Sequence, residues 1–220
     1  MEPFVKICGI TRIEDAVAAL DAKADALGFV AYPLSPRHLD LAKIARIISD
    51  LRQENRVFKA VGVFVDPDIE TLEKHAEAGI DVFQLHGGES AELAEKAAET
   101  AEVWKALKPR SPNDIDAFAD FPADKFLVDA FHERLPGGTG LKVDAETAAR
   151  AVEILKAPVI LAGGLTPDNV GKALAEINPF GVDVSGGVES APGIKNRSLV
   201  EKFIMAAKKA SIPKREAENG

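Results

Sequence analysis

Val5-Lys6-Ile7-Cys8-Gly9-Ile10-Thr11 is the stretch that decides the fold, because it joins a short apolar run directly to a glycine and a helix-start signal. Thr11 and Glu14 have the spacing at which a capping residue and the third helical residue satisfy each other's backbone N–H groups. The stretch therefore predicts one strand followed by one helix, with Cys8 at the carboxyl end of the strand.

Further short apolar runs, rich in β-branched residues, follow along the chain, and stretches of helical period separate them. Beyond Val5–Cys8 these runs are Ala26–Tyr32, Lys59–Val65, Val82–His86, Val103–Leu107, Lys125–Phe131, Pro158–Ala162 and Gly181–Ser185. Strands that alternate with helices in this number predict a single (β/α)8 barrel, since an open doubly wound sheet rarely needs so many. We assign residues 1–210 to this α/β TIM barrel and residues 211–220 to a flexible C-terminal tail that has little to bury.

Capping signals follow several of the runs. Asp66-Pro67, Ser111-Pro112 and Thr166-Pro167 each place a capping residue before a proline at the first helical position. Ser198 and Glu201 have the spacing of a capping box. These residues predict where helices of the barrel begin.

Composition excludes several classes of partner. The chain has 220 residues, and its 27 basic and 35 acidic residues give a formal net charge of −8, which argues against a nucleic-acid surface. No run approaches the roughly 20 apolar residues of a membrane span, and Met1-Glu2-Pro3-Phe4 lacks the pattern of a signal peptide. One cysteine cannot form an internal disulfide, and the four histidines show no metal-ligand spacing. We expect a soluble cytoplasmic protein without a metal site and without nucleic-acid or membrane partners.

Glycines gather at strand ends in the C-terminal half of the chain. They lie after the sixth, seventh and eighth predicted strands, in Gly137-Gly138-Thr139-Gly140, Gly163-Gly164 and Gly186-Gly187. Glycine lets the backbone approach an anion closely, and barrels frequently bind phosphate between the loops after strands seven and eight. Each pair alone is also compatible with an ordinary tight turn. Together the turns predict a phosphate-binding cradle.

Two ionisable side chains end strands of the predicted barrel. Asp129 ends its run as Cys8 ends the first, and strand ends converge on one mouth of a barrel. Lys6 lies two residues before Cys8 and shares its face of the strand. A cysteine acts as a base only as the thiolate, which requires a positive neighbour or a helix N-terminus. From the residues alone, Cys8 is either a catalytic base or a small buried core residue.

Five segments carry a resemblance to a known family. They are Val5–Thr11, Phe83–Gly87, Gly138–Gly140, Leu161–Leu165 and Asp183–Glu189. In this order they resemble the motifs of the phosphoribosylanthranilate isomerases of tryptophan biosynthesis, and the resemblance covers nearly the full chain. It implies a cofactor-free Amadori rearrangement, in which N-(5'-phosphoribosyl)anthranilate opens its ribose ring and becomes the 1-deoxyribulose 5-phosphate derivative.

The resemblance also implies roles for individual side chains. Asp129 would be the general acid that protonates the furanose ring oxygen, and Cys8 the general base that takes a proton from the adjacent sugar carbon. Arg37, in Ser35-Pro36-Arg37, would hold the anthranilate carboxylate, because its planar fork meets a carboxylate with two hydrogen bonds. The other substrate contacts would come from Gly138, Thr139, Gly140, Gly163, Gly164, Asp183, Ser185, Gly186 and Gly187, with Lys6, Gln84 and His86 in support. Two of these residues have a second interpretation: Arg37 as a solvated surface arginine, and Asp183 as a buried structural carboxylate. The partner would be a small phosphorylated molecule, and the chain a monomer or a homodimer.

The chain departs from the family pattern in two places. Leu141-Lys142-Val143-Asp144 stands where relatives often have an aromatic-Asp-aromatic segment, which changes the expected packing beside the substrate ring. Gly186 stands where many relatives have serine, so one hydroxyl near the phosphate is missing while the backbone N–H groups remain.

Three alternative functions lead to different expectations. An isomerase of histidine biosynthesis performs the same rearrangement with two aspartates, and it would have an aspartate in place of Cys8. A metal-dependent pentose-phosphate epimerase would need clustered His and Asp ligands. A non-catalytic barrel that binds a phosphorylated ligand would keep the glycine turns and have no need for the acid and the base.

Overall fold

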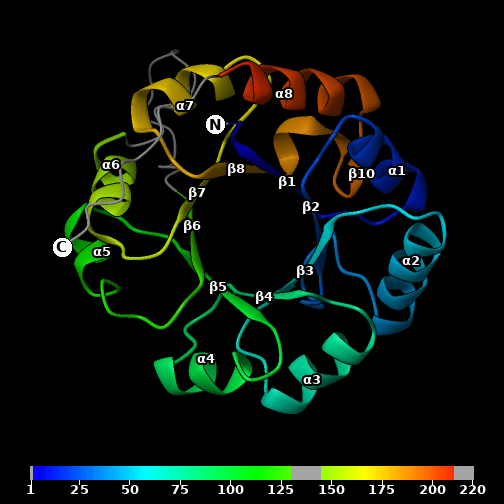
Figure 1. Cartoon of the computed structure of the whole chain (residues 1–220), viewed down its shortest axis with the longest axis horizontal. Helices are drawn as coiled ribbons and strands as arrows, with labels where there is room; N and C mark the ends of the chain where they lie inside the picture. The colour runs from blue at the N-terminus through cyan, green and yellow to red at the C-terminus, as the bar shows by residue number, and fades with distance from the viewer. Residues whose placement is uncertain (1, 130–144, 211–220) are drawn as a thin grey trace.

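The computed structural model of the chain describes residues 2–129 and 145–210. Its first eight strands pair in parallel and close into one barrel in chain order (Figure 1). These strands are β1 (Phe4–Cys8), β2 (Ala26–Val30), β3 (Lys59–Phe64), β4 (Val82–Leu85), β5 (Glu102–Leu107), β6 (Lys125–Asp129), β7 (Val159–Ala162) and β8 (Gly181–Val184). The predicted (β/α)8 barrel is confirmed.

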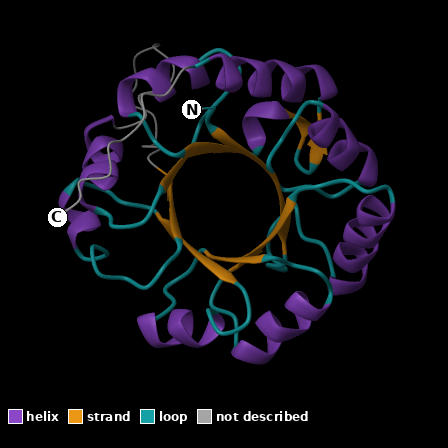
Figure 2. Cartoon of the chain, in the orientation of Figure 1, coloured by secondary structure: helices purple, strands orange, loops and turns teal. Residues whose placement is uncertain are grey.

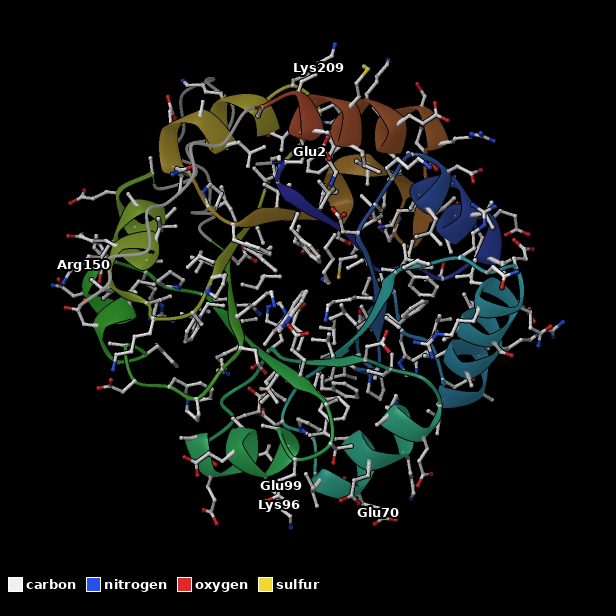
Figure 3. The ribbon with its side chains drawn as sticks, viewed as in Figure 1. Glu2, Glu70, Lys96, Glu99, Arg150 and Lys209 are labelled. Atoms are coloured by element: carbon white, nitrogen blue, oxygen red, sulfur yellow. The ribbon has the colours of Figure 1, made fainter. Side chains whose placement is uncertain are left out.

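Helices form a ring around the barrel, as Figure 2 shows. They are α1 (Ile13–Asp21), α2 (Leu41–Gln53), α3 (Ile69–Glu77), α4 (Ala91–Ala97), α5 (Asn113–Asp116), α6 (Ala145–Ile154), α7 (Val170–Ile177) and α8 (Arg197–Lys209). Between β8 and α8 lie a short 3-10 helix, η1 (Gly186–Val188), and a two-stranded ribbon of β9 (Glu189–Ala191) and β10 (Ile194–Lys195). Charged side chains such as Glu70, Lys96 and Arg150 lie on the outer edge of the helix ring (Figure 3).

The observed strands overlap all eight predicted runs, but several end earlier than predicted. β2 ends at Val30 rather than Tyr32, β4 at Leu85 rather than His86, and β8 at Val184 rather than Ser185. The residues beyond these ends that line the mouth of the barrel are Tyr32, His86 and Ser185. Their side chains belong to the site, and the three residues lie outside the strands of the sheet. The predicted continuation of β6 to Phe131 and the predicted tail 211–220 lie outside the described residues.

All five helix starts predicted from capping signals are wrong by one to three residues. Thr11 does not cap α1, which begins after Arg12, and its hydroxyl donates instead to the backbone carbonyl of Gly193. Asn196 rather than Ser198 caps α8, where its Oδ1 accepts from a backbone N–H at 3.2 Å. Capping depends on where the loop turns back onto the barrel, so several nearby polar residues compete for it.

The loop before α3 gives the clearest case of this competition. Asp68 caps the helix, accepting from the N–H of Thr71 at 2.8 Å, whereas Asp66 was the predicted cap. Asp66 has a φ of +47° and accepts from the N–H of Gly88 at 2.7 Å. Its side chain therefore joins the loops after β3 and β4. The helices predicted to start after Ser111 and Thr166 likewise begin later, at Asn113 and Val170.

The apolar core has two layers. The larger layer lies between the strands and the surrounding helices. The smaller one fills the inside of the barrel with Ala26, Val61, Val82, Trp104, Ala106, Leu127, Ile160 and Ala162. Because the barrel interior is packed, a ligand site can form only above this layer, at one end of the strands.

Aromatic and charged side chains fill the amino end of the barrel. The ring of Phe4 lies 5.9 Å from that of Trp104 and 5.5 Å from that of Phe180, measured between centroids. Glu102 accepts from Trp104 Nε1 at 2.7 Å and forms ion pairs with Lys59 and Lys125. This end is occupied by the chain's own contacts, which leaves the carboxyl end for a site.

Candidate active site

A cavity of about 670 Å³ lies at the carboxyl ends of the strands. This volume is within the range of small-molecule sites. The predicted site residues that line the cavity are Cys8, Arg37, Gln84, His86, Asp129, Gly163, Gly164, Asp183, Ser185, Gly186 and Gly187. Cys8 from β1 and half-buried Asp129 from β6 thus face one common space, as the convergence of strand ends predicts. Gly138, Thr139 and Gly140 lie outside the described residues.

Lys6 and Cys8 point into the barrel from β1, and a glycine on β2 leaves room for both. Gly28 pairs with Cys8 in the sheet. A Cβ atom at Gly28 would lie 2.8 Å from Cys8 Sγ and 3.1 Å from Lys6 Cε, which is closer than real side chains approach. Glycine at this position is therefore a packing requirement of the thiol and the ammonium group.

Lys6 forms a buried ion pair with Asp183 of β8. The distance from Lys6 Nζ to Asp183 Oδ1 is 2.7 Å, and the side-chain exposures are 0% and 10%. Burial alone lowers the pKa of Lys6, but the charges of Asp183 and Cys8 and the hydrogen bond to Asp183 raise it above its ordinary value. Lys6 therefore stays positively charged at neutral pH, two residues before Cys8 on the same face of β1.

The environment of Cys8 opposes ionisation at rest. Burial raises the pKa of the thiol, Lys6 and Lys195 lower it, and Asp183 raises it, with a net pKa above the ordinary value. The positive neighbour that a thiolate requires is present, yet burial outweighs it. At neutral pH the resting group is the protonated thiol.

Arg37 lies in the loop after β2 and directs its planar fork at a carboxylate of the chain itself. Its Nε donates to Glu189 Oε1 at 2.8 Å, and its Nη2 donates to Glu189 Oε2 at 2.6 Å. Burial raises the pKa of Glu189, but hydrogen bonds from Arg37 and Lys195 lower it to about 2. A second carboxylate can reach Arg37 through the remaining donors of the guanidinium, on Nη1 and Nη2. Gly186 lies on this side, with its Cβ position 3.6 Å from Arg37 Nη2.

Gln84 and His86 lie on the inward face of β4 and just beyond its end. Gln84 Nε2 lies 3.3 Å from His86 Nδ1. Burial, followed by the charges of Lys108 and Lys6, lowers the pKa of His86 to about 4, so the imidazole is neutral at physiological pH. Within the described part of the chain, Gln84 Oε1, His86 Nε2 and Ser185 Oγ are buried and have no hydrogen-bond partner. All three belong to cavity-lining residues, so a polar ligand could satisfy them.

The glycine turns after β7 and β8 lie against each other. Gly163 and Gly164 have φ values of +87° and +57°, which favour glycine. A Cβ at Gly187 would lie 1.9 Å from the backbone oxygen of Leu165, so the two loops touch through their backbones. Gly186 and Gly187 begin η1, and a short extra helix at this place is a frequent phosphate site of barrel enzymes.

Sequence reasoning missed four residues of the site region. Tyr32 and Lys108 line the cavity, and a usable signal is their place in the predicted strands: Tyr32 ends the second run and Lys108 directly follows the fifth. Glu189 and Lys195 lie behind it. Glu189 accepts hydrogen bonds from Arg37 and Lys195, and Lys195 also donates to the backbone carbonyl of Cys8. Lys195 lies on the ribbon rather than on a barrel strand, so the strand-end pattern could not have found it.

Among residues 2–129 and 145–210, no group of three or more His, Cys, Asp or Glu side chains is placed to hold a metal ion. Over the same ranges, no helix has both the length and the apolar character that a membrane span needs.

A closed (β/α)8 barrel that gathers a carboxyl group, a thiol and paired cations around a cavity at its carboxyl end is the architecture of a TIM-barrel enzyme. The sequence matches the family described as N-(5'-phosphoribosyl)anthranilate (PRA) isomerase over residues 5–206, and the chain belongs to this family.

Individual relatives agree with this assignment. The N-(5'-phosphoribosyl)anthranilate isomerase of Geobacter sp. (strain M21) is 43% identical over 208 residues, which are 94% of this chain and 98% of that protein. The crystal structure of phosphoribosyl anthranilate isomerase from Thermotoga maritima has a TM-score of 0.85 and 36% identity, covering 94% of this chain and 98% of that one. A phosphoribosyl anthranilate isomerase in complex with reduced 1-(o-carboxyphenylamino)-1-deoxyribulose 5-phosphate has a TM-score of 0.83 and 35% identity, with the same two coverages.

Proposed function

We propose that this chain isomerises N-(5'-phosphoribosyl)anthranilate to 1-(2-carboxyphenylamino)-1-deoxyribulose 5-phosphate in tryptophan biosynthesis, by a cofactor-free Amadori rearrangement. The observation that carries the proposal is that Cys8 and Asp129, from strands far apart in sequence, line one cavity together with Arg37 and the glycine turns. The family membership of the chain and the ligand named for the related complex agree with this substrate.

The reaction begins at the furanose ring. Asp129 gives a proton to the ring oxygen, and the bond from that oxygen to the anomeric carbon breaks. The nitrogen lone pair then forms a protonated imine with the anomeric carbon. This step needs a carboxylic acid beside the ring oxygen, and Asp129 is the carboxyl group that β6 brings to the cavity.

The second step moves a proton from carbon to sulfur. The thiolate of Cys8 removes the proton from the sugar carbon next to the imine, and the electron pair forms an enolamine while it neutralises the nitrogen. Cys8 then returns its proton to the former anomeric carbon, and the enol hydroxyl gives its proton to the carboxylate of Asp129. The hydroxyl-bearing carbon becomes the ketone, and both side chains regain the protonation states with which they entered the reaction. The protonated imine is a cation close to the sulfur, so it favours the thiolate when the base is needed. Because the resting pKa of Cys8 is raised, turnover should increase with pH above neutrality.

The remaining groups bind the substrate. The backbone of Gly163, Gly164, Gly186 and Gly187 holds the phosphate at the turns after β7 and β8. Arg37 receives the anthranilate carboxylate on the guanidinium edge that Glu189 does not use. The sugar hydroxyls form hydrogen bonds with the unpartnered polar atoms of Gln84, His86 and Ser185, each of which accepts from or donates to a hydroxyl. The imidazole acts there as a neutral group, because its pKa is about 4.

Turnover of freshly generated phosphoribosylanthranilate, followed by its fluorescence, tests the proposal. Cys8→Ala and Asp129→Asn should each lower kcat by about 10²- to 10⁴-fold, the usual contribution of a general acid or base. Both variants should still bind the reduced product analogue in calorimetry. Asp120→Asn, a change on a side chain that is 85% exposed, is the matched control and should keep full activity. A wild-type chain without turnover would refute the function, and an active Cys8→Ala or Asp129→Asn would remove that residue from the mechanism.

Arg37→Ala tests the binding role separately. The change should raise KM more than it lowers kcat, because the carboxylate contact holds substrate and transition state alike. Unchanged KM and kcat/KM would show that the carboxylate binds elsewhere.

A further inference from the structure

Lys195 is a buried cation whose role the proposed mechanism does not use. It lies on β10 of the ribbon, and its side chain is 1% exposed. Its Nζ donates to the backbone carbonyl of Cys8 at 2.5 Å, to Glu189 Oε1 at 2.9 Å and to the carbonyl of Ser185 at 3.3 Å. All three donors of the ammonium group are used, and two of them hold backbone at the ends of β1 and β8.

Glu189 extends this network to Arg37. One carboxylate receives Lys195 Nζ, the N–H of Gly193 at 3.1 Å and the two fork donors of Arg37. The side chain of Glu189 is 5% exposed. A continuous chain of hydrogen bonds therefore runs from the backbone of Cys8 through Lys195 and Glu189 to the guanidinium of Arg37.

The backbone of Lys195 is itself fixed from α1. Its N–H donates to Asp15 Oδ2 at 3.1 Å, and Asp15 is held by Arg12 through hydrogen bonds of 3.0 and 2.6 Å. The next residue, Asn196, donates its N–H to the carbonyl of Val188 at 2.8 Å. The backbone of Lys195 and Asn196 is thus anchored by two neighbouring segments, which fixes the position from which the ammonium group holds its partners.

We propose that Lys195 is a positioning residue for two parts of the site: it holds the strand end that carries Cys8, and through Glu189 it sets the guanidinium of Arg37. The inference rests on the proposed function, because it assigns the two positioned groups to base catalysis and to carboxylate binding. A buried ion pair is weak support for stability, since apolar side chains of similar size often stabilise as well. The contacts of Lys195 are therefore explained by the positions that they fix, at the backbone of Cys8 and at the carboxylate of Glu189.

The charge of Lys195 also acts on the thiol. The charged groups around Cys8 are Lys6 from β1, Asp183 from β8, Lys195 from β10 and Arg37 from the loop after β2. Burial raises the pKa of Cys8 and Lys195 is one of the two cations that lower it. Removing this cation should therefore shift the ionisation of the thiol upward, an effect that a purely structural loss would not produce.

The first experiment measures alkylation of Cys8 by iodoacetamide against pH, without substrate. Cys8 is the only cysteine of the chain, so the modification reports this thiol alone. Lys195→Met should move the midpoint pH of alkylation upward, because the cation that opposes burial is removed. Lys195→Arg keeps the charge and should stay near wild type, as should Lys172→Met, a control at a lysine that is 77% exposed. An unchanged midpoint in a folded Lys195→Met would overturn the effect on Cys8.

The second experiment compares turnover in single and double variants. Lys195→Met should lower kcat/KM on the order of 10²-fold, through a lower kcat and a higher KM. In an Arg37→Ala background it should lower kcat again but raise KM no further, because the link to Arg37 is already broken. Fully additive changes in KM would overturn the positioning of Arg37.

Glu189→Gln keeps the test decisive if Lys195→Met does not fold. It should raise KM in the wild-type background and not in the Arg37→Ala background. If the wild type has no turnover, the proposed function fails, whereas an alkylation midpoint that still responds to Lys195 would support the contact with Cys8. The two failures are therefore distinguishable.

Discussion

Replacing Lys6 with Met tests the electrostatic design of the site most directly, because it removes the ammonium group and leaves Asp183 without its cation. The two charges lie 2.7 Å apart and are almost fully buried. At an effective dielectric constant of about 20, charges at this distance attract by roughly 6 kcal/mol, and desolvation offsets part of that attraction. Breaking such a pair from one side typically costs about 3–5 kcal/mol, which we expect as the loss in free energy of unfolding.

A double variant separates the loss of the pair from the loss of the lysine. Lys6→Met with Asp183→Asn removes both charges, so no unpaired ion remains in the barrel. This variant should be more stable than Lys6→Met alone by about 2 kcal/mol or more. Urea unfolding at pH 7, followed by circular dichroism, gives the free energies of the wild type, both single variants and the double variant.

Cys8 alkylation in the same variants gives an independent readout. Lys6 lowers the pKa of the thiol and Asp183 raises it, after burial has raised it most. The midpoint of alkylation should therefore be lowest in the wild type, intermediate in the double variant and highest in Lys6→Met. A loss below about 1 kcal/mol in Lys6→Met, or a double variant no more stable than the single one, would refute the reasoning, because a buried charge cannot lose its partner at so small a cost.

Three further predictions follow from packing and from charge. Gly28→Ala should destabilise the chain by about 1–3 kcal/mol and reduce turnover, since its methyl group would lie 2.8 Å from Cys8 Sγ. Gly187→Ala should lower Tm by several degrees, because its Cβ would lie 1.9 Å from a backbone oxygen, whereas Gly186→Ala has 3.6 Å to its nearest atom and should change stability by less than about 0.5 kcal/mol. Glu102→Gln should reduce the loss of stability between pH 4.5 and pH 2: burial raises the pKa of Glu102, but its hydrogen bonds lower it to about 2, so its carboxylate stabilises the fold above its ordinary pKa and loses that effect as pH falls. The effect is about 2 kcal/mol after allowance for solvent screening.

Each of these predictions has a clear contrary result. Equal Tm values for the two glycine variants would mean that the loops after β7 and β8 do not touch through their backbones. A Gly28→Ala variant with wild-type turnover would mean that Cys8 has another position during the reaction. Parallel pH profiles of unfolding for the wild type and Glu102→Gln would exclude this carboxylate as the titrating group. Glu70→Gln, at a side chain that is 72% exposed, is the control.

The strands could be predicted from the sequence because each is a short apolar run between helical stretches, a signal that belongs to the strand itself. The convergence of Cys8 and Asp129 then followed from barrel geometry, and the chemical roles that we propose for them from the resemblance to a family. Helix starts were predicted less accurately than strands. Asp66 and Asp68 are both good caps, and only the hydrogen bond of Asp66 to the loop after β4 decides between them. Local capping preference does not distinguish between such residues.

The charge network behind the cavity was also beyond sequence reasoning, for a different reason. Lys6 and Asp183 are 177 positions apart, and Lys195 and the carbonyl of Cys8 are 187 positions apart. Their pairing depends on closure of the barrel between β1 and β8 and on the fold of the ribbon after β8. Lys6 could be placed on the face of Cys8, but its partner could not be named.

The buried charges bear on the proposed role of Cys8 as the base. Lys6, Arg37 and Lys195 bring three positive charges to the region of Cys8, and Asp183 and Glu189 bring two negative ones. The excess of one positive charge in these five groups favours one more anion, which is the thiolate, while burial of the sulfur favours the neutral thiol. Because the two influences oppose each other, a single added cation near the sulfur can reverse the balance. The protonated imine of the proposed intermediate is such a cation, so the base would ionise where and when the substrate carbon must lose its proton.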